Sequence, residues 1–258
     1  MPAALNVRDQ GPVRIFSIAH PARKNAVDAA VLARIAAETA RATADGVRAI
    51  VLMGEGADFC SGYDLNAVEA WDPLDLAAEL PDAPLGRACA ALEAAGPPVI
   101  AAVEGVAFGA GCELACACDF RVASPKARFC VPPAKLGIVY SAEGVARILR
   151  LVGLQAARSL FLRALQLSAA DAEGMGLVDQ VADEPLGAAL KLASDLAALA
   201  PRSIAGMKRT LNAVSRTALD DGTRAELDHL RREAFASADA KEGRAAFLER
   251  RPPRWTGR

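Results

Sequence analysis

Short apolar segments rich in β-branched residues alternate with helical segments over the first two-thirds of the chain. The strand candidates are residues 13–19, 47–53, 99–103 and 120–123. Residues 28–41 place apolar side chains on one helical face, with Asp28 suited to cap the N-terminus, and residues 110–118 predict a second helix. The alternation predicts an α/β fold in which helices cover most of the strands.

Beyond about residue 185 the pattern becomes helical only. The helices expected there are residues 186–199, 203–214, 223–235 and 241–250. We therefore expect a core over residues 1–190 and a helical region over residues 191–258 that supports oligomerisation or closes a pocket. Residues 64–84 carry three prolines among acidic residues with no long period, which predicts a mobile loop with a short helix covering a pocket.

The charges nearly balance, since 30 Lys and Arg face 31 Asp and Glu for a formal charge of −1. We therefore expect no nucleic-acid partner, although a local basic pocket for an anionic ligand stays open. Residues 97–120 are the most apolar stretch but carry three acidic side chains, so no membrane span is expected, and the N-terminus has no secretory pattern. Six cysteines in apolar segments suit reduced, buried thiols, which favours a cytoplasmic location.

Residues 103–114 combine a strand, a glycine-containing turn and a helix start, so free N–H groups and the positive end of a helix dipole face one point. This is typical of an anion site, but the spacing matches neither glycine-rich nucleotide-phosphate motif. Glu113 lies about one turn inside that helix, near enough to reach the same ligand. A buried carboxylate needs a reason, and a capping or salt-bridging role is the plain alternative.

Two further segments each have an ordinary explanation beside a functional one. Residues 58–65 hold small residues that let backbone amides approach a ligand, but a strand-to-helix turn accounts for them equally. Residues 129–144 lead from a strand end through a loop into a helix starting near Ser141, and Tyr140 is either a pocket phenol or a packed aromatic.

No metal site is expected. Cys112 and Cys116 share a helix face while Cys118 points elsewhere, and no histidine complements them, so small buried thiols explain them best. His20 and His229 have no nucleophile nearby in the sequence, and we assign neither a catalytic role.

An ordered set of segments carries a family resemblance. The segments are residues 20–26, 50–52, 59–65, 98–105, 109–115, 118–119, 174–179 and 242–251. Each is weak alone, but together they resemble the enoyl-CoA hydratase/isomerase (crotonase) superfamily over nearly the whole chain. The resemblance implies an α/β fold of the ClpP/crotonase type, a spiral of ββα units with a helical C-terminal region that builds homotrimers or hexamers.

The resemblance also implies an acyl-coenzyme A thioester as substrate, with no cofactor because coenzyme A is part of that substrate. By position, the backbone N–H groups of Tyr63 and Ala110 form an oxyanion hole around the thioester carbonyl. Chemistry next to a thioester passes through an enolate, and one preorganised donor at such an oxygen is typically worth about 10²–10³ in rate. Ala110 stands where the family often has glycine, which is tolerable because the amide acts.

Substrate-contacting residues follow from the same resemblance. The set is Arg23, Lys24, Ala26, Ser61, Tyr63, Asp64, Leu65, Asn66, Ala110 and Pro133. Arg23 and Lys24 are the candidates for the coenzyme A phosphates, although a cationic pair in a loop is also commonly just solvated. Tyr63 to Asn66 are expected to line the pantetheine and adenine channel.

The chain departs from the family pattern at one catalytic position. Glu113 matches the first of two glutamates that family hydratases use to hold water, but Pro133 stands at the second and cannot transfer a proton. Residues 132–140 instead resemble methylmalonyl-CoA decarboxylase, in which a tyrosine at the position of Tyr140 orients the substrate carboxylate. That branch has histidine where this chain has Tyr63.

Three hypotheses therefore stay open. The leading one is a lyase or isomerase of fatty acid metabolism acting on an acyl-CoA, with Glu113 as acid/base. The second is a decarboxylase that uses Tyr140 and the oxyanion hole. The third is a non-catalytic acyl-CoA-binding protein.

Overall fold

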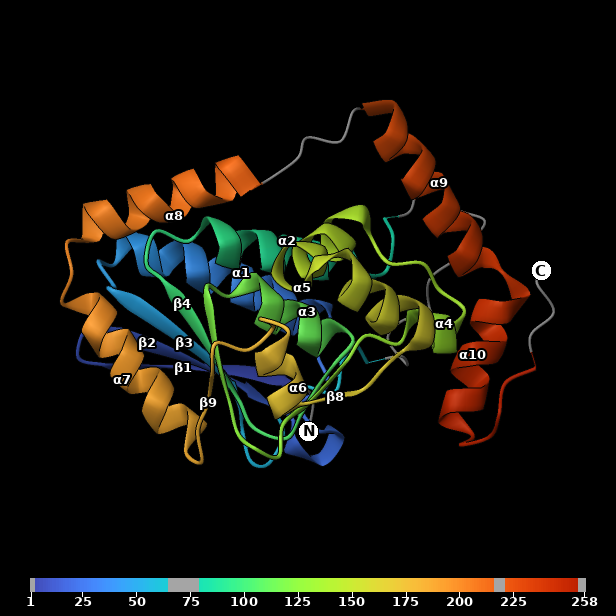
Figure 1. Cartoon of the computed structure of the whole chain (residues 1–258), viewed down its shortest axis with the longest axis horizontal. Coiled ribbons are helices and arrows are strands. Elements are labelled where there is room, and N and C mark those ends of the chain that lie inside the picture. The colour runs from blue at the N-terminus through green and yellow to red at the C-terminus, as the bar shows by residue number, and fades with distance from the viewer. Residues whose placement is uncertain (1–2, 65–78, 216–220, 255–258) are drawn as a thin grey trace.

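The computed structural model describes residues 3–64, 79–215 and 221–254, and these form two sheets and a set of covering helices (Figure 1). The larger sheet has the order β1-β2-β3-β4-β6-β9 and the smaller one β5-β7-β8. The strands are β1 Ala4–Gln10, β2 Val13–Ala19, β3 Ala49–Gly54, β4 Val99–Val103, β5 Val106–Phe108, β6 Phe120–Ala123, β7 Arg128–Cys130, β8 Leu167–Ser168 and β9 Gln180–Val181. Only the β1–β2 and β7–β8 pairs are antiparallel, so crossover connections join the other neighbours.

The helices lie mainly on the two faces of the larger sheet and at the C-terminal end of the chain. They are α1 Ala29–Ala44, α2 Ala83–Ala94, α3 Ala110–Ala117, α4 Pro133–Leu136, α5 Ala142–Arg163, α6 Ala169–Gly174, α7 Pro185–Ala197, α8 Pro201–Ser215, α9 Asp221–Ala236 and α10 Ala238–Leu248. The expected α/β alternation is confirmed.

Both faces of the larger sheet are buried because successive side chains of a strand point to opposite sides. In β2, Phe16 and Ile18 join the cluster under α1, α2 and α3, whereas Ile15 joins the cluster under α7. α7 covers its face through Ala189 and Ala193, four residues apart on one helical face, and lies below the sheet in Figure 1. Two covered faces explain why the central strands read as continuous apolar runs.

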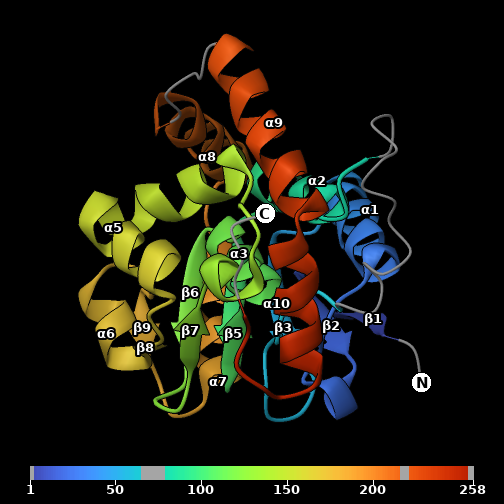
Figure 2. The same ribbon diagram turned by 90° about the vertical axis from the view of Figure 1, so that its right-hand side faces the viewer.

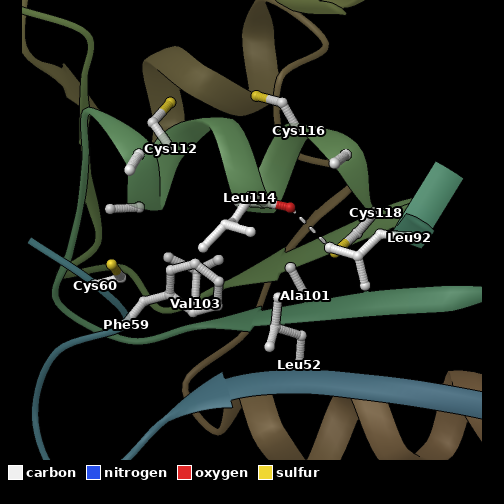
Figure 3. Close-up of a cluster of buried hydrophobic side chains, with 14 of the residues drawn as sticks. Leu52, Phe59, Cys60, Leu92, Ala101, Val103, Cys112, Leu114, Cys116 and Cys118 are labelled. Carbon is white, nitrogen blue, oxygen red and sulfur yellow. Dashed lines mark hydrogen bonds between the residues drawn. The ribbon is translucent and has the colours of Figure 1, made fainter. Parts of the chain in front are cut away.

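Helix α3 is buried on two opposite sides, and its Cys112, Leu114 and Cys116 belong to one core cluster. Leu114 points from α3 toward β4, while the sulfur atoms of Cys112 and Cys116 point to the opposite side (Figure 3). The Cys118 thiol donates to the Leu114 carbonyl at 3.4 Å. The shared face of Cys112 and Cys116 is as expected, and all six cysteines of the chain are free and buried.

Local sequence signals account for two helix starts that matter for the site. The Asp28 carboxylate accepts from Val31 N at 2.9 Å and caps α1. The Ser141 hydroxyl accepts from Gly144 N at 3.0 Å and caps α5. Both starts were expected from the sequence.

Buried contacts attach the C-terminal helices to the rest of the molecule. Lys208 of α8 is buried and its ammonium reaches the end of α2, while α9 and α10 form the near side of the molecule in Figure 2. α10 packs on α4, because a Cβ on Gly243 would meet the Leu136 carbonyl at 2.5 Å and one on Gly137 would meet the Asp239 carbonyl at 2.6 Å. The division predicted at residue 190 falls inside α7, which packs on the sheet, and the two-region division stays a prediction.

Within the predicted loop of residues 64–84, residues 65–78 lie outside the described part of the chain. α2 begins at Ala83, so the last two residues of that stretch are helical, and the covering loop stays a prediction. In the described part, no helix is both long and apolar enough to cross a membrane.

Candidate active site

Backbone hydrogen bonds fix the residues directly before and after Tyr63. Val27 N donates to the Gly62 carbonyl at 2.9 Å, and Asp64 N donates to the Val27 carbonyl at 2.8 Å. Ser61 N also donates to the Lys24 carbonyl at 2.9 Å. No hydrogen bond within the described residues uses the Tyr63 N–H itself, so this amide is fixed but available.

Ala110 supplies a second available amide. It is the first residue of α3, and the first N–H groups of a helix have no carbonyl partner in that helix. Gly109, just before it, donates to the Cys130 carbonyl at 2.8 Å and has φ of 51°, which favours glycine. The turn is thereby anchored to β7 while Ala110 N has no partner among the described residues.

Gly62, the residue before Tyr63, closely approaches the start of α3. A Cβ on Gly62 would lie 3.8 Å from Ala110 N and 3.1 Å from the Phe108 carbonyl oxygen, and Gly62 has φ of 118°. Tyr63 follows Gly62 directly in the chain, and that its N–H points to the same place as the Ala110 N–H stays a prediction. Only glycine fits at this approach.

Glu113 is buried one turn into α3, with its side chain 3% exposed. Its Oε1 accepts from Arg147 Nη1 at 2.7 Å. The first turn of α5 presses on the carboxylate, since a Cβ on Gly144 would lie 2.9 Å from the same oxygen. Glu113 therefore forms the salt bridge that the sequence left open as an alternative. This salt bridge places Glu113 beside α5, and it does not by itself give Glu113 a catalytic role.

Arg147 and Glu93 are site residues that the sequence did not reveal. Arg147 of α5 also binds Glu93 of α2, through Nε at 2.8 Å and Nη2 at 3.2 Å. The sequence offered one signal for Arg147, which is a charged residue within an apolar helical stretch. It could not show the partners, because Arg147, Glu93 and Glu113 come from segments far apart in the chain.

Tyr140 lies near the start of α3. Its hydroxyl would be 3.9 Å from a Cβ on Gly109, and its ring meets Phe161 edge-on at 5.5 Å between centroids. Burial, followed by the nearby charge of Glu113, raises the pKa of the Tyr140 phenol well above its usual value. The phenol therefore stays protonated and able to donate near neutral pH. Both expectations for Tyr140, a packed ring and a pocket hydroxyl, are compatible with this position.

Pro133 is buried at the start of α4, and it brings no proton-transferring group to the position of the second family glutamate. Glu143, on α5, is exposed. Over the described residues no group of three or more His, Cys, Asp or Glu side chains is arranged to hold a metal ion.

The two cations expected to bind phosphate already have carboxylate neighbours. Arg23 Nη1 lies 3.0 Å from both oxygens of Asp64, and Lys24 Nζ lies 3.9 Å from Asp58 Oδ2. Both cationic side chains are more than half exposed.

The remaining predicted substrate contacts lie in or next to the same segment. Ala26 is buried, and the Ser61 hydroxyl donates to the Arg23 carbonyl at 2.9 Å. Leu65 and Asn66 lie outside the described residues. All of these assignments stay predictions.

An α/β fold with available amides at Tyr63 and Ala110, and a buried Glu113 on the helix that begins at Ala110, is the arrangement expected of the crotonase class. The profile of the family described as enoyl-CoA hydratase/isomerase matches residues 9–258. The chain belongs to the enoyl-CoA hydratase/isomerase family, and it is an enzyme that acts on acyl-CoA thioesters.

Similar proteins support this membership over the full length. The 2,3-dehydroadipyl-CoA hydratase of Escherichia coli (strain K12) is 37% identical over 261 residues, covering 98% of this chain and 99% of that protein. A probable enoyl-CoA hydratase of Rhizobium meliloti (strain 1021) is 37% identical over 254 residues, covering 96% and 95%.

Solved structures agree on the fold. The enoyl-CoA hydratase/isomerase from Pseudoalteromonas atlantica T6c superposes with a TM-score of 0.84 at 30% identity, covering 98% of this chain and 99% of the other. Methylmalonyl CoA decarboxylase gives 0.87 at 24% identity with full coverage of both chains, which supports the fold alone. The predicted crotonase fold is confirmed.

Proposed function

We propose that this enzyme adds water to the double bond of an enoyl-CoA thioester. The N–H groups of Tyr63 and Ala110 hold the thioester oxygen as it becomes negative, and Glu113 transfers the proton. The observation that carries the proposal is the close approach of Gly62, which precedes Tyr63, to Ala110 N, while neither the Tyr63 nor the Ala110 amide has a partner among the described residues.

The oxyanion hole accounts for the largest part of the rate. Addition of hydroxide at the β-carbon moves the electron pair of the double bond to the α-carbon and, by resonance, to the thioester oxygen. Each preorganised donor at that oxygen is worth about 10²–10³ in rate. Neither donor has to break a bond first, because neither is engaged in the described structure.

Glu113 provides proton transfer with a single carboxylate. It takes a proton from water while the water oxygen bonds to the β-carbon, and the same proton is returned to the α-carbon, so the enzyme is unchanged at the end. Pro133 leaves the water with one carboxylate partner instead of two. The two relatives described above are named hydratases, which favours this reaction.

We further propose that Arg23 and Lys24 bind the phosphates of coenzyme A, with Ala26, Ser61 and residues 63–66 along the channel. The exposed cations would exchange their carboxylate neighbours for phosphate oxygens when the substrate arrives.

A decarboxylase is the second candidate, because the Tyr140 hydroxyl lies next to Gly109 and is kept protonated. In that reaction the phenol would donate to a substrate carboxylate, and loss of carbon dioxide would leave the same enolate without a base. A non-catalytic acyl-CoA-binding protein is the third.

Parallel assays of crotonyl-CoA hydration and methylmalonyl-CoA decarboxylation separate the candidates. We expect hydration, seen as loss of the absorbance of the conjugated thioester, and we expect Glu113→Gln to reduce kcat by at least about 10²-fold. Tyr140→Phe serves as the matched variant, which keeps the ring and removes only the hydroxyl.

Hydration that survives Glu113→Gln would overturn the assigned proton transfer. Carbon dioxide release that is lost in Tyr140→Phe would favour the decarboxylase. Coenzyme A binding with neither activity would leave the binding protein.

We also propose that residues 191–258 assemble the enzyme into a homotrimer or hexamer. On α8, Met207, Leu211 and Val214 follow helical spacing and are each more than half exposed. The free, buried thiols favour a cytoplasmic location for the enzyme.

A further inference from the structure

Three helices meet through one buried set of charges next to the proposed site. Arg147 of α5 lies between Glu113 of α3 and Glu93 of α2, and we call these three residues the charge triad. The side chain of Arg147 is 5% exposed and that of Glu93 is 13% exposed. The charges therefore interact with little screening by water.

The guanidinium uses different edges for its two partners. Nε and Nη2 form a fork on the two oxygens of Glu93, and Nη1 donates to Glu113 Oε1. A planar group that is gripped along one edge cannot turn, so Glu93 determines where Nη1 points. Lysine could supply the charge but not this fork.

Two carboxylates this close need the cation between them. Taking Arg147 away would leave Glu113 buried with Glu93 as a like charge, and both effects oppose the ionised form. Arg150 of the same helix also approaches Glu93, at 3.6 Å, but its side chain is 29% exposed. Arg147 is thus the cation that serves both carboxylates.

We propose that Arg147 is a positioning residue for Glu113, and that Glu93 sets the direction of the Arg147 guanidinium. The inference rests on the proposed role of Glu113 as the proton-transferring group. Through the charge triad, the C-terminal end of α2 and the N-terminal end of α5 determine where the Glu113 carboxylate lies relative to the amides of Tyr63 and Ala110.

The groups that face Glu113 predict how activity depends on pH. They are Cys89 and Glu93 on α2, Cys112 and Cys116 on α3, Tyr140 before α5, and Arg147 on α5. The thiols of Cys89 and Cys112 and the phenol of Tyr140 have pKa values raised by burial or by neighbouring groups, so they remain uncharged near neutral pH. The hydrogen bond with Cys112 lowers the pKa of the Cys116 thiol instead, but this thiol is the same in every variant below. The charges that the variants change are those of Arg147 and Glu93.

Arg147→Met and Glu93→Gln are expected to move the acid limb of the pH profile in opposite directions. Without Arg147, ionised Glu113 loses its cation, so the acid limb of kcat rises by about one to three pH units. Without the charge of Glu93, ionised Glu113 loses a like-charge neighbour, so the limb does not rise and moves toward lower pH. Arg147→Lys keeps the charge, so its limb stays near that of the wild type while kcat falls because the fork is lost.

The expected kinetics are a fall in kcat of up to about 10²-fold in Arg147→Met with KM nearly unchanged, and a smaller fall in Glu93→Gln. Arg158→Met is the matched control, with the same change at an exposed position of the same helix, and we expect its pH profile to match the wild type. Circular dichroism and the dissociation constant for coenzyme A establish that each variant is folded and binds.

The outcomes separate this inference from the proposed function. Activity that survives Glu113→Gln overturns the proposed function itself. If Glu113→Gln is inactive while Arg147→Met and Glu93→Gln keep the wild-type acid limb and kcat, the positioning role is wrong and the proposed function stands. If Arg147→Met does not fold, Glu93→Gln decides alone, because wild-type kcat in that variant contradicts the inference.

Discussion

Gly144 is the residue at which a single methyl group should separate activity from stability. Its missing Cβ would lie 2.9 Å from Glu113 Oε1 and 3.0 Å from the Ser141 hydroxyl, and both are ends of side chains that can move. Glycine at this place therefore makes room for the carboxylate rather than for the backbone.

We predict that Gly144→Ala lowers kcat by up to about 10²-fold, because the methyl group displaces the Glu113 carboxylate. The melting temperature should stay nearly unchanged, since alanine in a helix offsets the contact by roughly 0.5–1 kcal/mol. Steady-state kinetics and thermal unfolding measure the two effects.

Gly187→Ala, in the first turn of α7, is the control because its new Cβ would meet only the Glu184 side chain at 3.8 Å. Its kcat should equal that of the wild type. Wild-type kcat in Gly144→Ala would contradict the close packing of α5 on Glu113.

At the level of single residues, the sequence predicted those features that depend only on neighbouring residues in the chain. Asp28 and Ser141 cap helices as expected because an N-cap depends only on neighbouring backbone. The role of Arg147 was missed because its partners Glu113 and Glu93 are 34 and 54 residues away in the chain, and no local sequence pattern predicts an ion pair over that separation. The placement of Glu113 next to α5 likewise depends on tertiary packing.

Among the elements, α8 depends most on one buried side chain. The Lys208 ammonium donates to the Leu92 carbonyl at 3.0 Å and to Asp119 Oδ2 at 2.6 Å. It thereby satisfies a carbonyl near the end of α2 and neutralises a carboxylate that is only 22% exposed.

We predict that Lys208→Met lowers the free energy of unfolding by about 3 kcal/mol, the lower end of the range for breaking a buried ion pair because Asp119 keeps some solvent contact. Denaturant unfolding measures the change. Lys191→Met removes an exposed pair with Asp195 on α7 and should change the free energy of unfolding far less, because water screens that pair. Equal costs in the two variants would contradict the anchoring role of Lys208.

Elements with a strong apolar pattern were predictable and the others were not. Strands β2, β4 and β6 begin and end where the sequence indicates, because both of their faces are buried. The edge strand β1 was missed because its alternate residues are exposed and polar. β5 was missed because it is three residues long and its pairing with β7 is not visible locally.

At the scale of the whole molecule, the exposed stripe of α8 is the surface to test. Met207, Leu211 and Val214 lie on one helical face, and α8 runs along the upper edge of the molecule in Figure 1. An apolar stripe of this kind is costly to leave in water.

We predict that Leu211→Glu dissociates the assembly that residues 191–258 build, because a carboxylate would be buried without a partner. Light scattering coupled to size-exclusion chromatography gives the mass. Arg209→Glu, whose position on α8 faces away from the stripe, should keep the wild-type mass. A monomeric wild-type enzyme would contradict the proposed oligomer.

The most direct test of the catalytic proposal is a crystal structure of the enzyme with butyryl-CoA, a saturated thioester that cannot be hydrated. The thioester oxygen should lie about 2.7–3.1 Å from both Tyr63 N and Ala110 N, with the Glu113 carboxylate facing the α- and β-carbons. A thioester oxygen bound elsewhere, or either amide paired with protein in that complex, would contradict the account.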